Sequence, residues 1–543
     1  MALENYAKNL SNKAEHAGNA STEHDEGIIA APGFLKSVSY GSGGIRDLVG
    51  SGYALGAAIL ASMGGFSMGY DMDVISIINV MDQFHKQYPL AETDFGKELM
   101  TAILLLGAFI GCLFMPYMAD RYSRKWALTI VVILFDIGAS LQTAAPDYAC
   151  LVWGRFIGGL GVGTLAMGAP LYISEISPPN LRGTLLVLES ISIGLGCVVA
   201  YFITFGTRHM PGEASFRLPF GLQMVTATIL GAGIHFFPYS PRWLALVNRP
   251  EDCLQSLTKL RGLPSSDERI QAEFHGIMSE MTFQNLAQQK QHPGASGLKL
   301  ELMLWSDLFR KKYWRRTAIG TGVAFFQQFS GINAFIYYAP TLFTSLGQTP
   351  EMSKILSGVF NIIQMVAAIV CFLVIEKVGR RPLAIWGGFG MSATYIIIAV
   401  LSALYGKSWT SHAAAGWGCV AMAFLFIGIY GLSYAPLGWA LPSEVFSTTT
   451  RSKGVALSTC MIWLADFVVG ISTPSMLSNI TYGTYIFFAA MCFLAGLWAF
   501  FLLPETSGKT LEELDEVFGD TSGQDERDLV GAAVNFSRSG TVM

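Results

Sequence analysis

Charged residues are scarce in this chain, because Asp, Glu, Lys and Arg together make up 14% of its 543 residues. An average soluble protein carries roughly 25%. The eight cysteines are scattered without metal or redox spacing, so we expect packing roles, no disulfides and no metal site. Nucleophile–base pairs and phosphate-binding loops are also lacking. We therefore expect no enzymatic activity, no cofactor and no nucleic-acid partner.

Hydrophobic residues, by contrast, make up 52% of the chain, and its mean hydropathy is +0.44. They gather in runs, each long enough for the ~20 residues that a spanning helix needs. The alternation of a β-barrel is absent, so the fold class we predict is an all-α membrane protein embedded in a lipid bilayer. The predicted spans are twelve, at 53–78, 98–119, 126–146, 149–172, 184–206, 219–238, 316–345, 354–376, 383–405, 413–441, 454–476 and 482–503.

Polar segments divide the chain into five parts. Residues 1–52 are predicted to be a disordered N-terminal tail without a signal peptide, and 504–543 a C-terminal tail. The polar segment 239–315 is predicted to be a linker with short surface helices. It separates an N-terminal half of six spans, 53–238, from a C-terminal half of six spans, 316–503.

Lysine and arginine are distributed unequally between the two sets of loops. About a dozen lie in the 239–315 linker, and further basic clusters follow spans 2, 8 and 10. The loops on the other side hold only Lys86, Lys97, Arg208, Arg217, Lys354 and Lys407. The positive-inside rule then predicts that both termini are cytoplasmic. We expect a monomer in the plasma membrane.

The two halves repeat each other. Asp120-Arg-Tyr-Ser-Arg-Lys125 after span 2 matches Glu376-Lys-Val-Gly-Arg-Arg381 after span 8. Glu175 and Arg182, seven residues apart after span 4, match Glu444 and Arg451 after span 10. Repeated halves with a site at the midplane are typical of secondary transporters.

Span 7 contains an unusually polar run at 327–338. Its amides and phenols are too polar to face lipid at no cost, because an unpaired buried amide costs kilocalories. Amides both donate and accept hydrogen bonds without carrying charge, which suits a hydroxyl-rich solute. The alternative is inter-helix hydrogen bonding without any solute.

These motifs, taken in order, resemble the sugar porter branch of the major facilitator superfamily, and fungal hexose and monosaccharide transporters in particular. The likeness covers about residues 53–515. It is carried by the motifs at 69–71 (Gly-Tyr-Asp), 120–125, 154–155 (Gly-Arg), 170–182, 240–243 (Ser-Pro-Arg-Trp), 327–338, 376–381, 439–444 and 504–508 (Pro-Glu-Thr-Ser-Gly).

The resemblance implies transport of a monosaccharide, a hexose or a pentose, by alternating access with proton symport. The alternatives are a facilitative uniporter and a transporter-like sugar sensor. The expected partners are the sugar and protons. By resemblance, the candidate sugar-contacting residues are Gln327, Gln328, Asn333, Tyr337, Tyr338, Gln364 and Trp439. In span 11, Trp463 is a further candidate, and helical spacing adds Asp466, where many relatives have a neutral Asn.

Acids within spans are candidates for proton coupling, because a charge at membrane depth tends to face a cavity or a partner. The resemblance assigns proton binding to Asp71 and modulation of that acid to Arg155. Asp73 adds a second carboxylate where relatives have a small residue. A purely structural Asp71–Arg155 pair is the alternative.

Charged residues at the cytoplasmic loops form the last candidate set. The resemblance implies a latch of ion pairs that breaks when the inside opens, and the alternative is that they only mark the cytoplasmic side. The set comprises Arg121, Arg124, Glu175, Arg182, Glu376, Arg380, Arg381, Glu444 and Arg451. Ser123 occupies a position where the family usually has glycine.

Overall fold

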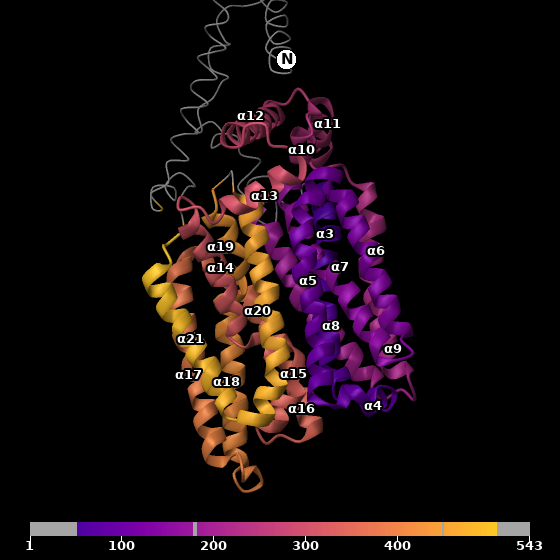
Figure 1. Cartoon of the computed structure of the whole chain (residues 1–543), viewed down its shortest axis with the longest axis vertical. Coiled ribbons are helices and arrows are strands. Elements are labelled where there is room, and N and C mark those ends of the chain that lie inside the picture. The colour runs from indigo at the N-terminus through magenta and orange to yellow at the C-terminus, as the bar shows by residue number, and fades with distance from the viewer. Residues whose placement is uncertain (1–51, 178–181, 448–449, 508–517, 519–543) are drawn as a thin grey trace, which may run out of the picture.

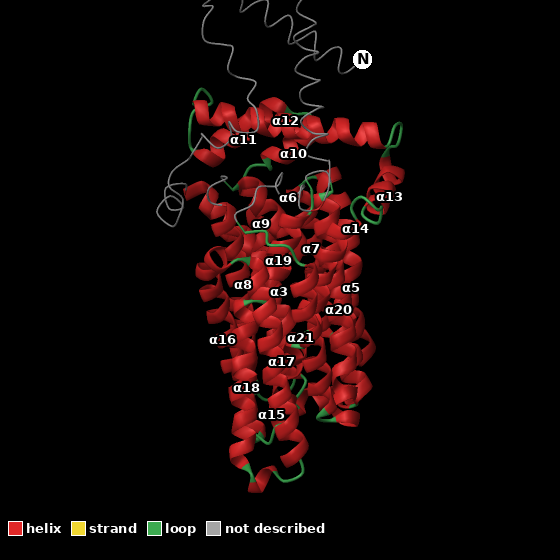
Figure 2. Cartoon of the chain, turned by 90° about the vertical axis from the view of Figure 1, so that its left-hand side faces the viewer, coloured by secondary structure: helices red, strands yellow, loops and turns green. Residues whose placement is uncertain are grey.

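The computed structural model of this chain describes residues 52–177, 182–447, 450–507 and 518. Every regular element in these ranges is a helix (Figure 2). The long helices run side by side and form an elongated bundle, whereas the helices that follow the first six spans lie across one end of it (Figure 1). We call this end the linker end and the opposite end the far end.

The N-terminal half contains six long helices. They are α3 (Gly52–Ile78), α5 (Asp94–Tyr122), α6 (Arg124–Ala144), α7 (Tyr148–Ile176), α8 (Arg182–Thr207) and α9 (Ala214–Gly233). The short α4 (Asp82–Gln87) and the 3₁₀ turn η2 (Pro89–Glu92) join α3 to α5 at the far end, and η3 (Ile234–Phe236) follows α9.

The C-terminal half contains eight helices, two pairs of which replace single spans. They are α14 (Trp314–Phe329), α15 (Ile332–Ser345), α16 (Pro350–Val378), α17 (Arg380–Tyr405), α18 (Ala413–Leu432), α19 (Tyr434–Val445), α20 (Arg451–Ile480) and α21 (Gly483–Leu502), with the turn η4 (Trp409–Ser411) before α18. Between the halves lie α10 (Pro241–Leu246), α11 (Pro250–Arg261), α12 (Glu268–Gln291) and α13 (Gly297–Asp307).

The predicted fold class is confirmed. Ten of the described helical segments are long and apolar enough to cross a membrane, and the pair α18–α19 counts as one of them. With α3 and the pair α14–α15 they make up twelve spans. The runs at 316–345 and 413–441 are each interrupted, near Gly331 and Ser433.

Glycine allows the helices of the N-terminal half to approach closely. A Cβ on Gly159 of α7 would lie 2.1 Å from the carbonyl oxygen of Leu104 in α5. A Cβ on Gly138 of α6 would lie 2.2 Å from the amide nitrogen of Gly158. Both contacts are too short for any side chain, so these small residues permit backbone-to-backbone packing, which is common between membrane helices.

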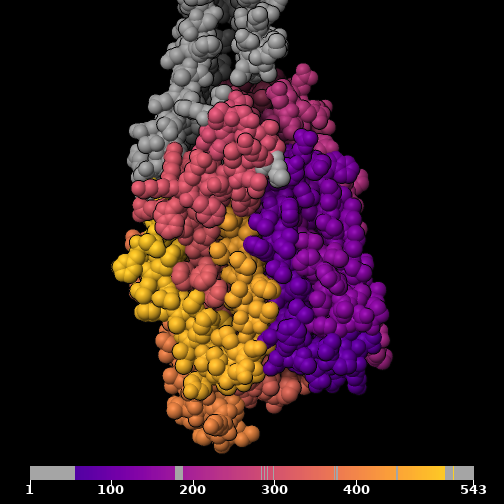
Figure 3. All heavy atoms as spheres, viewed as in Figure 1, coloured from indigo at the N-terminus to yellow at the C-terminus, as the bar shows by residue number. Residues whose placement is uncertain are grey.

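The two halves meet along a boundary that we call the seam. Helix α5 packs against α20, α8 against α16, and α3 against α15. In the space-filling view the indigo and purple N-terminal half lies directly beside the yellow C-terminal helices (Figure 3). Residues that face the seam from both halves are therefore placed to respond when one half moves against the other.

Candidate functional site

The helix break between α14 and α15 brings the amides of span 7 together. Gly331 adopts a left-handed backbone with φ of 84°, which glycine accommodates without strain. Chain direction changes there, so Gln327 and Gln328 at the end of α14 lie close to Asn333 at the start of α15. All three side chains are buried.

These three amides form a hydrogen-bonded cluster. The Asn333 Nδ2 donates to Gln328 Oε1 at 2.6 Å, and Gln328 Nε2 lies 3.5 Å from Gln327 Oε1. Gln327 Nε2 donates to the carbonyl oxygens of Tyr434 and Ala435, both at 3.1 Å, in the first turn of α19. The cluster thus connects the break in span 7 to the break in span 10. We call it the amide cluster.

The two tyrosines of the run reach α20. Tyr337 donates to Asp466 Oδ2 at 2.9 Å, and Asp466 is fully buried. Tyr338 donates to the carbonyl oxygen of Gly470 at 3.0 Å. That carbonyl lacks its usual helical donor because the residue four positions later is Pro474, which has no N–H. Tyr338 therefore satisfies a group that the proline leaves open.

The other three sugar candidates lie on α16, α19 and α20. Trp463 of α20 is fully buried, whereas Trp439 of α19 is half-buried and follows Gly438, whose Cα approaches the Gln327 side chain. A Cβ on Gly438 would lie 2.2 Å from Gln327 Oε1. Gln364 of α16 makes no hydrogen bond through its buried Oε1 to any described residue. It does not join the amide cluster.

Asp71 and Arg155 face each other in the N-terminal half. The Arg155 Nη1 lies 3.9 Å from Asp71 Oδ1, and both side chains are buried. The guanidinium also donates from Nε to the carbonyl oxygen of Met100 at 2.8 Å and from Nη1 to Gln142 Oε1 at 3.4 Å. Neither oxygen of Asp71 has a hydrogen-bond partner among the described residues. The carboxylate thus has an ionic partner but keeps its hydrogen-bonding capacity.

Asp73 lies across the seam from a residue that sequence reasoning missed. Asn361 of α16 donates from Nδ2 to Asp73 Oδ2 at 2.8 Å, and both side chains are buried. The sugar-contacting candidate predicted in this helix was Gln364, three residues later. The only signal for Asn361 was its own polarity inside an apolar span. The Asp73–Asn361 bond joins the two halves.

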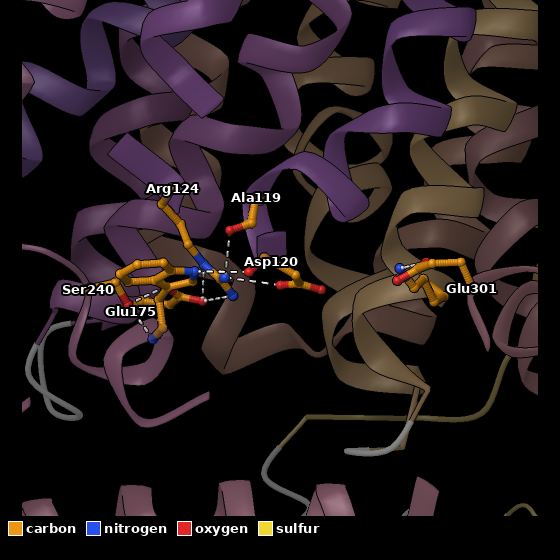
Figure 4. Close-up of polar contacts among 8 residues, drawn as sticks. Ala119, Asp120, Arg124, Glu175, Ser240 and Glu301 are labelled. Carbon is orange, nitrogen blue, oxygen red and sulfur yellow. Dashed lines mark hydrogen bonds and ion pairs between the residues drawn. The ribbon is translucent and has the colours of Figure 1, made fainter. Parts of the chain in front are cut away.

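At the linker end, ion pairs surround Arg124 in the N-terminal half. Its Nη2 lies 2.7 Å from Glu175 Oε1, and its Nη1 lies 3.0 Å from Asp120 Oδ1. Ser240, at the start of the linker, donates its hydroxyl to the other oxygen of Glu175. Figure 4 shows these side chains converging from α5, α6, α7 and the linker. The contacts of Arg124 with Asp120 and Glu175 join the ends of α5, α6 and α7.

An equivalent network lies in the C-terminal half. Arg380 Nη2 contacts Glu444 Oε1 at 2.9 Å, and Thr506 donates to the other oxygen of Glu444 at 2.6 Å. Glu505 accepts backbone N–H bonds from Arg380, Arg381, Thr506 and Ser507. Burial raises the pKa of Glu505, but these four donors outweigh it and hold the pKa below its ordinary value.

Four latch candidates remain besides these networks, namely Arg121, Arg182, Glu376 and Arg451. Arg121 is exposed, and Arg451 is the first residue of α20. The side chains of Arg182 and Glu376 lie outside the described residues. The Arg124–Glu175 and Arg380–Glu444 pairs each lie within one half, so they brace the helix ends on either side of the seam.

Known proteins match the chain over most of its length. The family model described as "Sugar (and other) transporter" matches residues 57–518. A high-affinity glucose transporter of Kluyveromyces lactis is 32% identical over 486 residues, covering 86% of this chain and 85% of that protein. The sugar transporter STL1 of Saccharomyces cerevisiae is 32% identical over 476 residues, covering 84% and 80%.

A solved structure supports the same assignment. The proton:xylose symporter XylE, bound to 6-bromo-6-deoxy-D-glucose, superposes with a TM-score of 0.71 at 25% identity, covering 86% of this chain and 99% of that one. The fold and the amide cluster together define a membrane transporter of two six-span halves. The chain belongs to the sugar transporter family of the major facilitator superfamily, whose members move solutes and are not enzymes.

Proposed function

We propose that this protein carries a monosaccharide, a hexose or a pentose, across the membrane by alternating access coupled to a proton. The observation that carries the proposal is the amide cluster, where Gln327, Gln328 and Asn333 meet between two broken spans. A neutral site of this kind matches sugar hydroxyls as donor and acceptor while avoiding the tight binding of a charge. The similar proteins named for glucose and xylose support the substrate class.

In this proposal Asn333, Gln327, Gln328 and Gln364 contact sugar hydroxyls. Trp439 and Trp463 offer apolar faces to the C–H groups of the ring. Tyr337 and Tyr338 close the site from the far end, because α15 is a separate short helix with a further kink at Tyr338, where φ is −127° and ψ is 20°. Asp466 positions Tyr337 through their hydrogen bond.

Proton coupling is assigned to Asp71, with Arg155 and Asp73 as its partners. A buried carboxylate with an ionic partner but no hydrogen bond can accept a proton without first breaking a hydrogen bond. A protonated Asp71 releases the attraction of Arg155, which contacts the backbone of α5. The charge state of Asp71 is thereby linked to a helix that lines the seam.

We further propose that the linker end faces the cytoplasm, with both termini on that side of the plasma membrane, and that the protein works as a monomer. The unequal distribution of lysine and arginine supports this orientation. The ion pairs of Arg124 and Arg380 then form the latch that braces the cytoplasmic end, together with their neighbours Glu175 and Glu444.

Uptake of a labelled sugar panel by a yeast strain without its own hexose transporters tests the proposal. The experiment is repeated at acidic and neutral pH and with an uncoupler. We expect saturable monosaccharide uptake that rises at acidic pH and falls with the uncoupler. Uptake that does not depend on pH or on the uncoupler would indicate a facilitative uniporter instead. Normal surface expression without uptake of any sugar would favour a sugar sensor.

A further inference from the structure

Asp73 has one oxygen engaged and one oxygen open. Its Oδ2 accepts from Asn361, but its Oδ1 is buried and has no hydrogen-bond partner among the described residues. The side chain is 1% exposed, so a proton can reach Oδ1 only through protein groups or through water between them. The structure around Asp73 offers one such path.

Helix α16 carries a buried polar stripe that ends beside Asp73. Ser353, Ser357 and Asn361 recur every four residues, so they share one face of the helix, and each is at most 4% exposed. Eight residues separate the first from the last, which is about 12 Å along the helix. The stripe runs from the first turn of α16 at the far end towards the interior. A packed helix face of this kind is usually apolar. Its hydroxyl groups therefore indicate a role other than packing.

Hydrogen bonds join the serines of this stripe to Thr344 of α15 and to the backbone of α16, and a further bond joins α16 to α8. Thr344 Oγ1 donates to Ser353 Oγ at 3.0 Å, and Ser357 Oγ donates to the carbonyl oxygen of Ser353 at 2.7 Å. Tyr201 of α8 donates to the carbonyl oxygen of Lys354, and its phenol lies close to Ser357. Hydroxyl groups both donate and accept, and their hydrogens rotate to suit, so together with water between them they can pass a proton along.

The outer end of the stripe opens into a cavity. This cavity, of about 740 Å³, lies at the far end between α3, α4, α8, α15 and α16. Thr344 and Lys354 line it, together with the ion pair of Arg208 and Glu351. Water that fills this cavity can deliver protons to Thr344 of α15, which is hydrogen-bonded to Ser353 at the outer end of the stripe.

The groups that face Asp73 at the inner end come from three helices. Asn361 contacts it from α16, and the Cys197 thiol and the Tyr201 phenol of α8 lie close enough to interact with its charge. On α3 itself, Asp71 precedes it by two residues and is paired with Arg155. No basic side chain among the described residues forms an ion pair with Asp73, which leaves protonation as the way to neutralise it.

We propose that Asp73 is the carboxylate that first takes up the proton from the far side, through the hydroxyl file of Thr344, Ser353, Ser357 and Tyr201. The file lies between α8 and α16, apart from the amide cluster, so proton and sugar reach the interior by different routes. The inference rests on the proposed proton symport. A carboxylate and a proton become a carboxylic acid at Oδ1, and Asn361 still donates to Oδ2, so the seam bond survives loading.

The test separates proton movement from sugar movement. Addition of sugar to cells that express a proton symporter makes the medium more alkaline, whereas equilibrium exchange of labelled for unlabelled sugar needs no net proton flux. The variants are Tyr201→Phe and Ser357→Ala, with Ser357→Thr to restore the hydroxyl. Ser392→Ala is the matched control, because Ser392 is a buried serine that bonds a carbonyl between α17 and α21.

We expect both file variants to lose at least tenfold in sugar-induced alkalinisation while exchange stays within about twofold of the wild type. Ser357→Thr and Ser392→Ala are expected to retain both activities. Alkalinisation within twofold of the wild type in both file variants would overturn the hydroxyl file. An equal loss of alkalinisation and exchange would also overturn it, because it would show that these residues only contribute to packing. A wild type that transports sugar without alkalinisation would instead overturn the proton symport itself.

Discussion

Ser123 and Gly379 adopt nearly the same backbone conformation at equivalent places in the two halves. Ser123, between α5 and α6, has φ of 104° and ψ of 155°, and Gly379, between α16 and α17, has φ of 91° and ψ of 161°. This region is almost restricted to glycine, and a side chain held there costs about 1–3 kcal/mol. The N-terminal half therefore contains a strained turn that its repeat avoids.

Ser123→Gly is expected to stabilise the protein. The change removes the strain but also the hydroxyl that caps α6 by accepting from the Trp126 N–H at 3.3 Å, and replacing such a cap by glycine costs only a few tenths of a kcal/mol. The net gain is about 1 kcal/mol, measured as a higher thermal midpoint of the purified protein in detergent.

The reciprocal change, Gly379→Ser, should lower the midpoint, because a Cβ there would lie 2.7 Å from a carboxylate oxygen of Glu505. Equal midpoints for both variants and the wild type would contradict the strain argument.

Gly438→Ala should disable the amide cluster. The new Cβ would displace the Gln327 amide from the two carbonyl oxygens of α19. Loss of such buried bonds costs about 1–3 kcal/mol, and 1.4 kcal/mol corresponds to a factor of ten. We expect the KM for sugar uptake to rise about tenfold at unchanged surface expression. Gly428→Ala in α18 is the control, because its Cβ would meet nothing within 4 Å. Indistinguishable KM values for the two variants would count against Gln327 as a sugar contact.

We expect the hydrogen bonds of Glu98 to stabilise the far end of the seam more than the Arg208–Glu351 ion pair at the surface does. Glu98 of α5 is buried and accepts from the backbone N–H of Ser475 in α20 at 2.9 Å and from its hydroxyl. Glu98→Ala removes both bonds to the half-buried Ser475, at a cost of about 1–3 kcal/mol. The exposed Arg208–Glu351 pair contributes about 1 kcal/mol or less.

This difference can be measured with a cysteine placed at Thr101, which is buried one turn from Glu98, in a background free of the native cysteines. A membrane-impermeant maleimide should label it at least fivefold faster in the Glu98→Ala variant than in the parent. Glu351→Ala should change the rate by less than that. A larger effect of Glu351→Ala would reverse the proposed ranking.

The carboxylate of Glu505 predicts a pH dependence of stability. Its pKa is lowered in the folded protein, so its contribution is present above the ordinary value of 4.5 and is lost as the pH falls through the folded pKa. Glu505→Gln should therefore reduce the thermal midpoint at pH 7, and the gap to the wild type should shrink below pH 4.5. Glu92→Gln, at an exposed site, serves as the control. A gap that stays constant down to pH 4 would show that the charge is not responsible.

The ion pairs at the linker end predict a shift in conformational balance. Arg380→Glu places two acids together at Glu444 and should favour the state in which the linker end is open. The double variant Arg380→Glu with Glu444→Arg should restore part of the balance. Distances between spin labels on α5 and α20 measure the populations. Identical distance distributions for the single variant and the wild type would exclude a latch at this pair.

The twelve spans can be predicted from the sequence because each is a long apolar run. Which side chains of a span point towards its neighbours cannot be predicted in this way. Asn361 and Gln364 are three residues apart, so their side chains point about 60° apart around α16. Only packing against α3 decides that Asn361 meets Asp73. The break at Gly331 has a glycine at the break itself, whereas at the Ser433 break the nearest glycine, Gly431, lies within the last turn of α18.

Contacts between segments far apart in the sequence could not be predicted from it either. Glu98 and Ser475 are 377 residues apart, and nothing in either segment indicates that Pro474 places the Ser475 N–H opposite a carboxylate. The match between Asp120–Lys125 and its repeat did reveal equivalent networks, because the same loop geometry recurs in both halves. Repetition was visible in the sequence, and the partners across the seam were not.

The bonds from Gln327 to the start of α19 give the amide cluster a mechanical role. A bend at Gly331 moves α15 relative to α14, and a bend at Ser433 moves α19 relative to α18, yet both bends act on the hydrogen bonds of one side chain. The hydrogen bonds of Gln327 therefore couple the two bends to each other. If a sugar binds the Gln327 amide as proposed, we expect it to weaken this coupling and make both bends more flexible.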